Sequence, residues 1–208
     1  YSTKSNYWEK RNKEEFLNKW LREFDIAHHI RLESVNDGLG ITLRLYKSEE
    51  DNTGQLLADM GFGITQLVSI LLFIVTHGMP VIEEADPPYA IIAIEEPENH
   101  LHPAYQSLLA DMFYDAWERL GVMFVIETHS EYLIRKTQVI VAEAYAGNEA
   151  KCESCDYHIP PFDNPFKVYY IPKNDKPYEM IYRKDGNFEN DFGTGFYDEA
   201  ANLAFQTL

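Results

Sequence analysis

Two adjacent carboxylates, Glu95 and Glu96, follow directly after an apolar run of strand length, from Tyr89 to Ile94. Such a run is typical of a strand buried on both faces of a parallel sheet, and ligand sites in open α/β sheets lie at the carboxyl ends of such strands. Two neighbouring acids repel each other, so a cation, a water network or a hydrogen-bond donor must offset the repulsion. In nucleotide hydrolases one carboxylate holds the magnesium shell and the next orients or deprotonates the attacking water. On the dipeptide alone, a solvated strand end that starts a loop is an equal alternative.

A histidine follows the next apolar run. The sequence from Glu127 to Ser130 reads Glu-Thr-His-Ser, directly after the predicted strand 122–126. Because neighbouring parallel strands end on the same edge of a sheet, we expect His129 to lie close to Glu95 and Glu96. An imidazole there can contact a γ-phosphate or position water. Taken alone, this segment fits better a helix-capping turn in which His129 has no chemical role.

A glycine turn, Gly61-Phe62-Gly63, is the third candidate, because an apolar helix predicted from about Thr65 to Thr76 follows it. Glycines permit close backbone approach, and the N–H groups of a helix N-terminus together with the Thr65 hydroxyl suit a phosphate. The alternative is an ordinary glycine turn without a ligand.

The elements that must position these residues form a predicted βαβ unit. A helix starts near Pro103, which is tolerated in a first turn, and stops at Gly121. The flanking apolar runs are then parallel strands, 89–94 and 122–126, and Ser130 can cap a helix over 131–144. The rest of the chain predicts a helix over 9–25, strands 30–32 and 41–46 around the turn 36–38, a hairpin of 166–171 and 178–183, and a last helix over 196–205.

The order of the three candidates resembles the signature motif, Walker B motif, D-loop and H-loop of the ABC-type ATPases. Residues 94–103 and 126–131 are most similar to the AAA-type, SMC/RecF/OLD-like branch of that family, and the resemblance covers roughly Leu57 to Val141. It implies an α/β fold that forms the C-terminal part of a P-loop NTPase, with mainly parallel core strands and helices. Asp185-Gly186 and the segment 195–199 resemble a small C-terminal β-hairpin and helix extension of such ATPases. The expected organisation is a lead-in (1–56), an ATPase lobe (57–146), and a linker with the extension (147–208).

The resemblance assigns roles residue by residue, with ATP and Mg²⁺ as the implied cofactors. Glu95 takes the Walker B position that binds Mg²⁺ through water, where Asp is commoner, and Glu96 takes the position of the catalytic base. His129 takes the position of the switch histidine. Asn99 and His100 lie in the D-loop, which in this family communicates across a dimer. The signature motif contacts the γ-phosphate held by the opposite subunit; its residues here are Gly61, Gly63, Thr65 and Gln66.

One part of the family pattern is missing, because no G-x-x-x-x-G-K-[ST] motif occurs in these residues. We therefore expect that an N-terminal lobe with the Walker A motif lies outside this chain, and that this polypeptide alone does not turn over ATP. The resemblance further implies a homodimer that sandwiches ATP, a role in DNA maintenance or phage defence, and a nuclease or other effector as partner.

Composition limits the partners. The net charge of −16 does not support DNA binding by this piece, since phosphate neutralisation needs surplus Lys and Arg, but DNA binding by a larger protein stays open. The longest apolar run, 67–75, is too short to span a bilayer, and no secretory signal is visible, so a cytoplasmic protein without membrane contact is expected. Cys152, Cys155 and His158 have zinc-like spacing, but a structural site needs a fourth ligand; we expect reduced cysteines rather than zinc.

Two other functions remain open. A non-catalytic interaction module would use the acidic surface to dock a basic partner, although retention of Glu95, Glu96 and His129 argues against a degenerate site. A metal hydrolase would use Glu95, Glu96, Glu127 and the histidines, but His100 and His102 lack the four-residue spacing that places two ligands on one helix face.

Overall fold

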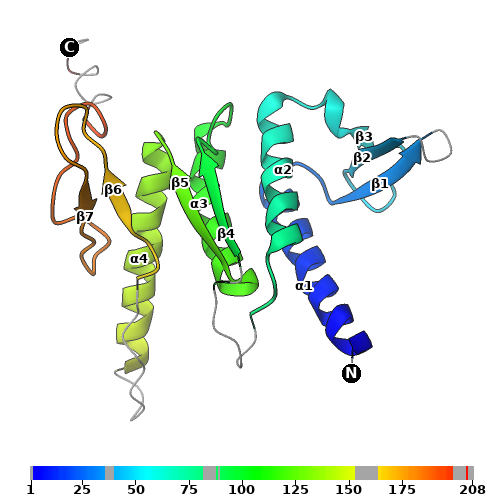
Figure 1. The fold of residues 1–208 in the computed structure, drawn as a ribbon, viewed down its shortest axis with the longest axis horizontal. Helices are drawn as coiled ribbons and strands as arrows, with labels where there is room; N and C mark the ends of the chain where they lie inside the picture. Colours follow the sequence, from blue (N-terminus) through cyan, green and yellow to red (C-terminus); the bar gives the residue numbers. More distant parts are fainter. Residues whose placement is uncertain are drawn as a thin grey trace. The chain divides into compact units, whose positions relative to one another are not determined.

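A computed structural model describes residues 2–35, 40–81, 88, 90–152, 164–198 and 205 (Figure 1). The chain forms two compact units, Tyr1–His129 and Ser130–Leu208. The division at His129 falls within the lobe predicted at 57–146, and the predicted domain boundaries stay predictions.

The first unit begins with helix α1 (Ser2–Glu23), which extends further toward the N-terminus than predicted. Its buried face carries Phe16, Trp20 and Leu21 at the spacing of an amphipathic helix, and Phe24, directly after the helix, is buried with them. The Trp20 indole N–H donates to the Asp115 carboxylate at 2.8 Å, so this face packs against helix α3 (Pro103–Leu120). The helix ends where Asp25 adopts a left-handed conformation (φ 50°).

A small antiparallel sheet follows, with strands in the order β1 (His29–Val35), β2 (Gly40–Tyr46) and β3 (Gln55–Leu56). The predicted hairpin is confirmed by the register, which pairs His29 with Tyr46 and Val35 with Gly40. The turn predicted at residues 36–38 lies outside the described residues, and the short strand β3 falls in a region for which no strand was predicted.

Helix α2 (Phe62–His77) follows the short 3-10 turn η1 (Leu57–Asp59) and begins three residues earlier than predicted. Gly61 is its N-cap and Gly78 its C-cap. Apolar residues cover most of its circumference, and those turned inward are Leu67, Val68, Leu71 and Ile74, all essentially fully buried.

The predicted βαβ unit is confirmed. Strands β4 (Ala90–Glu95) and β5 (Val122–Glu127) are parallel neighbours, and α3 (Pro103–Leu120) connects them (Figure 1). The His102 side chain accepts the Ala104 N–H at the start of α3, and Gly121 ends the helix in the left-handed conformation (φ 58°). The centres of the Phe113 and Phe124 rings are 4.7 Å apart, and this contact packs α3 onto one face of the strand pair. The prediction that the strand before Glu95 is buried on both faces is wrong, because the other face is open: Ile91 of β4 is 64% exposed and Val125 of β5 60%.

The second unit is built on helix α4 (Glu131–Cys152), which runs past the predicted end at residue 144. The predicted cap is confirmed, since the Ser130 hydroxyl accepts the Leu133 N–H at 3.2 Å. The predicted hairpin is present as the antiparallel strands β6 (Val168–Tyr170) and β7 (Tyr178–Met180). The segment after β7 packs on α4, because the Tyr182 and Thr137 hydroxyls lie 2.6 Å apart.

A cluster of aromatic rings completes this unit; its members are Tyr170, Tyr182, Phe188, Phe192, Phe196 and Tyr197. Arg135 of α4 lies over the Tyr197 ring at 4.0 Å from its centre, a cation–π contact. At the position of the last predicted helix, Phe196–Asp198 form bends rather than helix, and most of the remainder lies outside the described residues.

Candidate functional site

The candidate site lies at the carboxyl ends of β4 and β5. Glu95 and Glu127 are the last residues of the two strands and stand side by side in the parallel register. Both are exposed. Since residues at matching register positions point to the same face of a sheet, both acidic side chains lie on one face at this strand end.

The next residue, Glu96, lies close to His129, as expected from the parallel strands. The Glu96 backbone N–H donates to the Glu127 carbonyl at 2.8 Å, which extends the pairing of β4 and β5 by one hydrogen bond. The Glu96 Oε1 and His129 Nε2 atoms are 3.5 Å apart. The His129 side chain is 77% exposed and that of Glu96 42%, so both groups are open to a ligand or to water.

A tight turn from Glu96 to Leu101 joins the strand to α3. Glu96 and His100 both have positive φ values, 46° and 60°, in the left-handed region that non-glycine residues seldom adopt. Each such residue costs about 1–3 kcal/mol, and strained positions of this kind cluster at functional sites. The Asn99 N–H and side-chain amide both donate to Glu96, to its carbonyl and to its carboxylate respectively. The turn therefore holds the Glu96 carboxylate in a defined direction.

Glu98, in the middle of this turn, was not predicted as a site residue. It is only 7% exposed, and its Oε1 atom accepts the His129 backbone N–H at 2.7 Å. Its Oε2 atom is buried and has no hydrogen-bond partner among the described residues. The sequence contained one signal for it, a further acid two residues after Glu96, but nothing local indicated that this acid is buried.

The glycine turn and the start of α2 pack against the same turn. A Cβ atom at Gly63 would lie 2.5 Å from the His100 carbonyl oxygen, so only glycine fits there. The Phe62 and His100 rings are in edge contact, with centres 4.9 Å apart. Gln66 Nε2 donates to the Glu96 carbonyl at 3.2 Å. Residues predicted for the signature therefore contact residues predicted for the D-loop within the same chain.

The other two residues of the predicted signature have different surroundings. The Thr65 hydroxyl lies 3.4 Å from the carbonyls of Leu57 and Gly61, so it is used within its own turn. Gly61 is exposed, and a Cβ atom there would meet nothing within 4 Å. Of the two glycines, Gly61 leaves space for a ligand and Gly63 is required by packing.

Some of the candidate metal ligands lie within the described residues and others lie outside them. Within the described residues, no group of three or more His, Cys, Asp or Glu is placed to hold a metal ion by itself. Cys152 is the last residue of α4, and Cys155 and His158 lie outside the described residues.

No helix in the described part of the chain is both long and apolar enough to cross a membrane.

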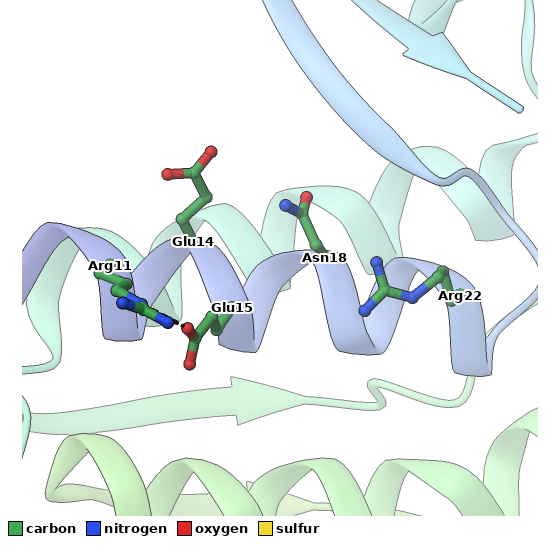
Figure 2. Close-up of a pocket in the computed structure, with 5 residues that line it drawn as sticks. All are labelled: Arg11, Glu14, Glu15, Asn18 and Arg22. Carbon is green, nitrogen blue, oxygen red and sulfur yellow. Dashed lines mark hydrogen bonds and ion pairs between the residues drawn. The ribbon is translucent and has the colours of Figure 1, made fainter. Parts of the chain in front are cut away.

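Two hollows occur elsewhere on the first unit. One, of about 280 Å³, is lined by α1 alone, through Arg11, Glu14, Glu15, Asn18 and Arg22 (Figure 2). Figure 2 shows Arg11 paired with Glu15, and their atoms are 2.8 Å apart. Because one helix face supplies all its walls, it has no convergent set of groups for a ligand. The other, of about 370 Å³, lies between α2 and β4 next to Gln66 and is otherwise mostly apolar.

Comparison with known proteins identifies the family. The family model described as AAA ATPase domain matches residues 2–134, more than half of the 208 residues. This chain therefore belongs to the AAA ATPase domain family. No curated protein matches it. Among solved structures, one from work on ATP-driven dimerization and DNA-stimulated activation of SMC ATPases has a TM-score of 0.48 and 9% identity, and the match covers 95% of this chain and 91% of the other.

Proposed function

We propose that this chain supplies the water-activating half of an ATP-hydrolysing switch. One observation carries the proposal: the Glu96 carboxylate and the His129 imidazole are 3.5 Å apart at the adjoining ends of two parallel strands. A carboxylate and an imidazole at that separation can share one water molecule or one proton. Membership of the AAA ATPase domain family makes ATP the natural substrate of such a pair.

Glu95 and Glu127 are suited to magnesium. Mg²⁺ prefers oxygen ligands and keeps several waters, so it binds through one or two carboxylates together with substrate phosphates rather than in an all-protein cage. Two exposed acidic residues at matching register positions fit that description. When bound, Mg²⁺ and ATP together would supply the charge neutralisation and the transferable phosphoryl group. Glu95 holds the ion through its water shell in this proposal.

Glu96 then acts as the base that orients the attacking water, and His129 contacts the γ-phosphate. The turn 96–101 supports this division, because Asn99 fixes the direction of the Glu96 carboxylate while His129 remains exposed. General-base assistance of this type contributes about 10²–10⁴ in rate.

The signature role is assigned to the exposed N-terminal end of α2. Gly61, Gly63, Thr65 and Gln66 line the first turn of the helix, and Gly61 leaves room for a phosphate against the backbone. We propose that this end contacts ATP bound by a second copy of the protein, and that Asn99 and His100 lie at the same dimer interface. The lysine-bearing phosphate loop is not among these 208 residues and would come from another segment.

The proposed biological role rests on the resemblance to the SMC/RecF/OLD-like branch. It favours a cytoplasmic switch in DNA maintenance or phage defence that works with a nuclease or another effector. The charge of −16 makes direct DNA contact by these residues unfavourable. A partner protein that touches DNA fits the charge better.

The test uses the natural full-length protein and the variant Glu96→Gln. Removing the base while keeping the side-chain shape should lower the ATP hydrolysis rate about 100-fold or more, with ATP binding retained. Glu143→Gln, which changes an exposed acid of α4, is the matched control and should keep the wild-type rate. Equal rates for wild type and Glu96→Gln would refute the assignment. Partner binding that is indifferent to nucleotide would favour the non-catalytic interaction module instead.

A further inference from the structure

Glu98 is an acid that lies almost wholly inside the first unit, although the proposed chemistry gives it no role. Only 7% of its surface is exposed. Burying a carboxylate is unfavourable unless hydrogen bonds or charges compensate for the lost water. The two residues that follow it differ, since Asn99 and His100 are exposed. The turn is therefore built with one acid, Glu96, open to the site and a second acid, Glu98, turned inward.

The inward carboxylate binds the backbone of the other strand end. Glu98 Oε1 accepts the His129 N–H at 2.7 Å, a short hydrogen bond of the charge-assisted kind between residues 31 positions apart. Hydrogen bonds to charged groups are roughly twice as strong as those between neutral ones. The second oxygen, Oε2, is buried without a partner among the described residues, so the His129 N–H is the contact through which this carboxylate acts.

The same turn thus controls both members of the proposed catalytic pair. Glu96 belongs to it, and His129 is held to it through Glu98. We propose that Glu98 is a positioning residue, whose buried carboxylate fixes the His129 backbone and so sets the separation of the His129 imidazole from the Glu96 carboxylate. The catalytic meaning of this contact rests on the proposed function, whereas the contact itself can be tested without it.

The first experiment tests the contact in this chain by using NMR to measure the hydrogen-exchange rate of the His129 backbone amide. Glu98→Gln keeps an oxygen acceptor, and Glu98→Met keeps the side-chain length but removes both oxygens. In Glu98→Met the His129 amide should exchange about 10- to 100-fold faster, whereas Glu98→Gln should stay within about threefold of wild type. If the Met variant does not fold, Glu98→Asp replaces it, because the shorter arm should also lose the contact. Unchanged exchange in the acceptor-deficient variant would overturn the proposal.

The second experiment measures ATP hydrolysis by the natural full-length protein. Glu98→Met should lower kcat about 10- to 100-fold with KM for ATP within about twofold, and Glu98→Gln should recover most of the rate. Ile74→Val, a core change in α2 that lowers stability alone, is the control and should leave kcat unchanged.

The two proposals fail in different ways. If hydrolysis does not depend on Glu96, the proposed function is wrong, and the exchange measurement still decides whether Glu98 holds His129. If hydrolysis depends on Glu96 but Glu98→Met keeps the wild-type kcat, the positioning role is wrong and the proposed function stands.

Discussion

The side-chain amide of Gln66 donates a hydrogen bond to the backbone carbonyl of Glu96 at 3.2 Å, and this bond joins the first turn of α2 to the residue proposed as catalytic base. The other end of the amide is less well matched, because Gln66 Oε1 is buried without a partner among the described residues. The carbonyl that receives the bond belongs to a residue in the left-handed conformation. This contact therefore supports a strained position from a distant part of the chain.

Substitution of Gln66 should separate the effect of the hydrogen bond from Nε2 from the effect of the unpaired Oε1 atom. Gln66→Met removes the donor and also the unpaired acceptor, so we expect the free energy of unfolding to change by less than about 1 kcal/mol. Gln66→Glu removes the donor and places a carboxylate against the Glu96 carbonyl, which should cost about 1–3 kcal/mol. Urea unfolding at neutral pH measures both variants. An equal loss in the two would mean that the hydrogen bond, rather than the mismatch, dominates.

The two glycines before α2 should respond differently to a methyl group. Gly63→Ala places a Cβ atom 2.5 Å from the His100 carbonyl, so the turn or the helix must move, at a cost of about 1–3 kcal/mol. Gly61→Ala meets nothing within 4 Å and should leave the melting temperature unchanged. Thermal unfolding distinguishes them. A Gly61→Ala protein that is stable but slow in ATP hydrolysis would support the proposed approach of a phosphate at this position.

The second unit depends on Gly186. Its φ is 79°, and a Cβ atom there would lie 2.1 Å from the Gln138 carbonyl of α4. Gly186→Ala should therefore lower the free energy of unfolding by about 2–4 kcal/mol and loosen the segment after β7. Gly147→Ala is the matched control, because this exposed glycine within α4 has open space around it and alanine should stabilise the helix by about 0.5–1 kcal/mol. Calorimetry of the two variants should show shifts of opposite sign.

The hydrogen bonds in the loop after β2 should depend on pH, because they are accepted by the Asp51 carboxylate. Its carboxylate accepts the backbone N–H groups of Lys47, Thr53 and Gly54, and these bonds lower its pKa from 3.8 to about 2. The contribution of a group with a depressed pKa is fully present above its unfolded value, here near 3.8, and is lost as the pH falls through about 2. We expect the Thr53 and Gly54 amide signals in NMR to shift with a midpoint near pH 2. A midpoint at 3.8 would show that these bonds are absent in solution.

Much of the first unit was predictable because its signals are local. The apolar run before Glu95, the proline that opens α3 and the glycine that ends it each act within a few residues, and they define β4, α3 and β5. The proximity of Glu96 and His129 was also predictable, since parallel neighbours end at the same edge. The end of α4, in the second unit, was less predictable: the helix runs past the predicted end at residue 144 and through Gly147, because a helix-interior glycine costs only about 1 kcal/mol.

The contacts inside the turn after β4 could not be predicted and are known only from the tertiary structure. Local strand and helix signals were enough to predict that acids follow one apolar strand and a histidine the next, because these signals act over a few residues. These local signals could not tell the partly exposed Glu96 from the buried Glu98, nor the open surroundings of Gly61 from the close packing at Gly63. Those distinctions come from contacts between residues about 30 or more positions apart, such as Glu98 with His129 and Gln66 with Glu96. Only the folded chain brings such partners together, and burial then decides which polar groups bind each other and which remain available for chemistry.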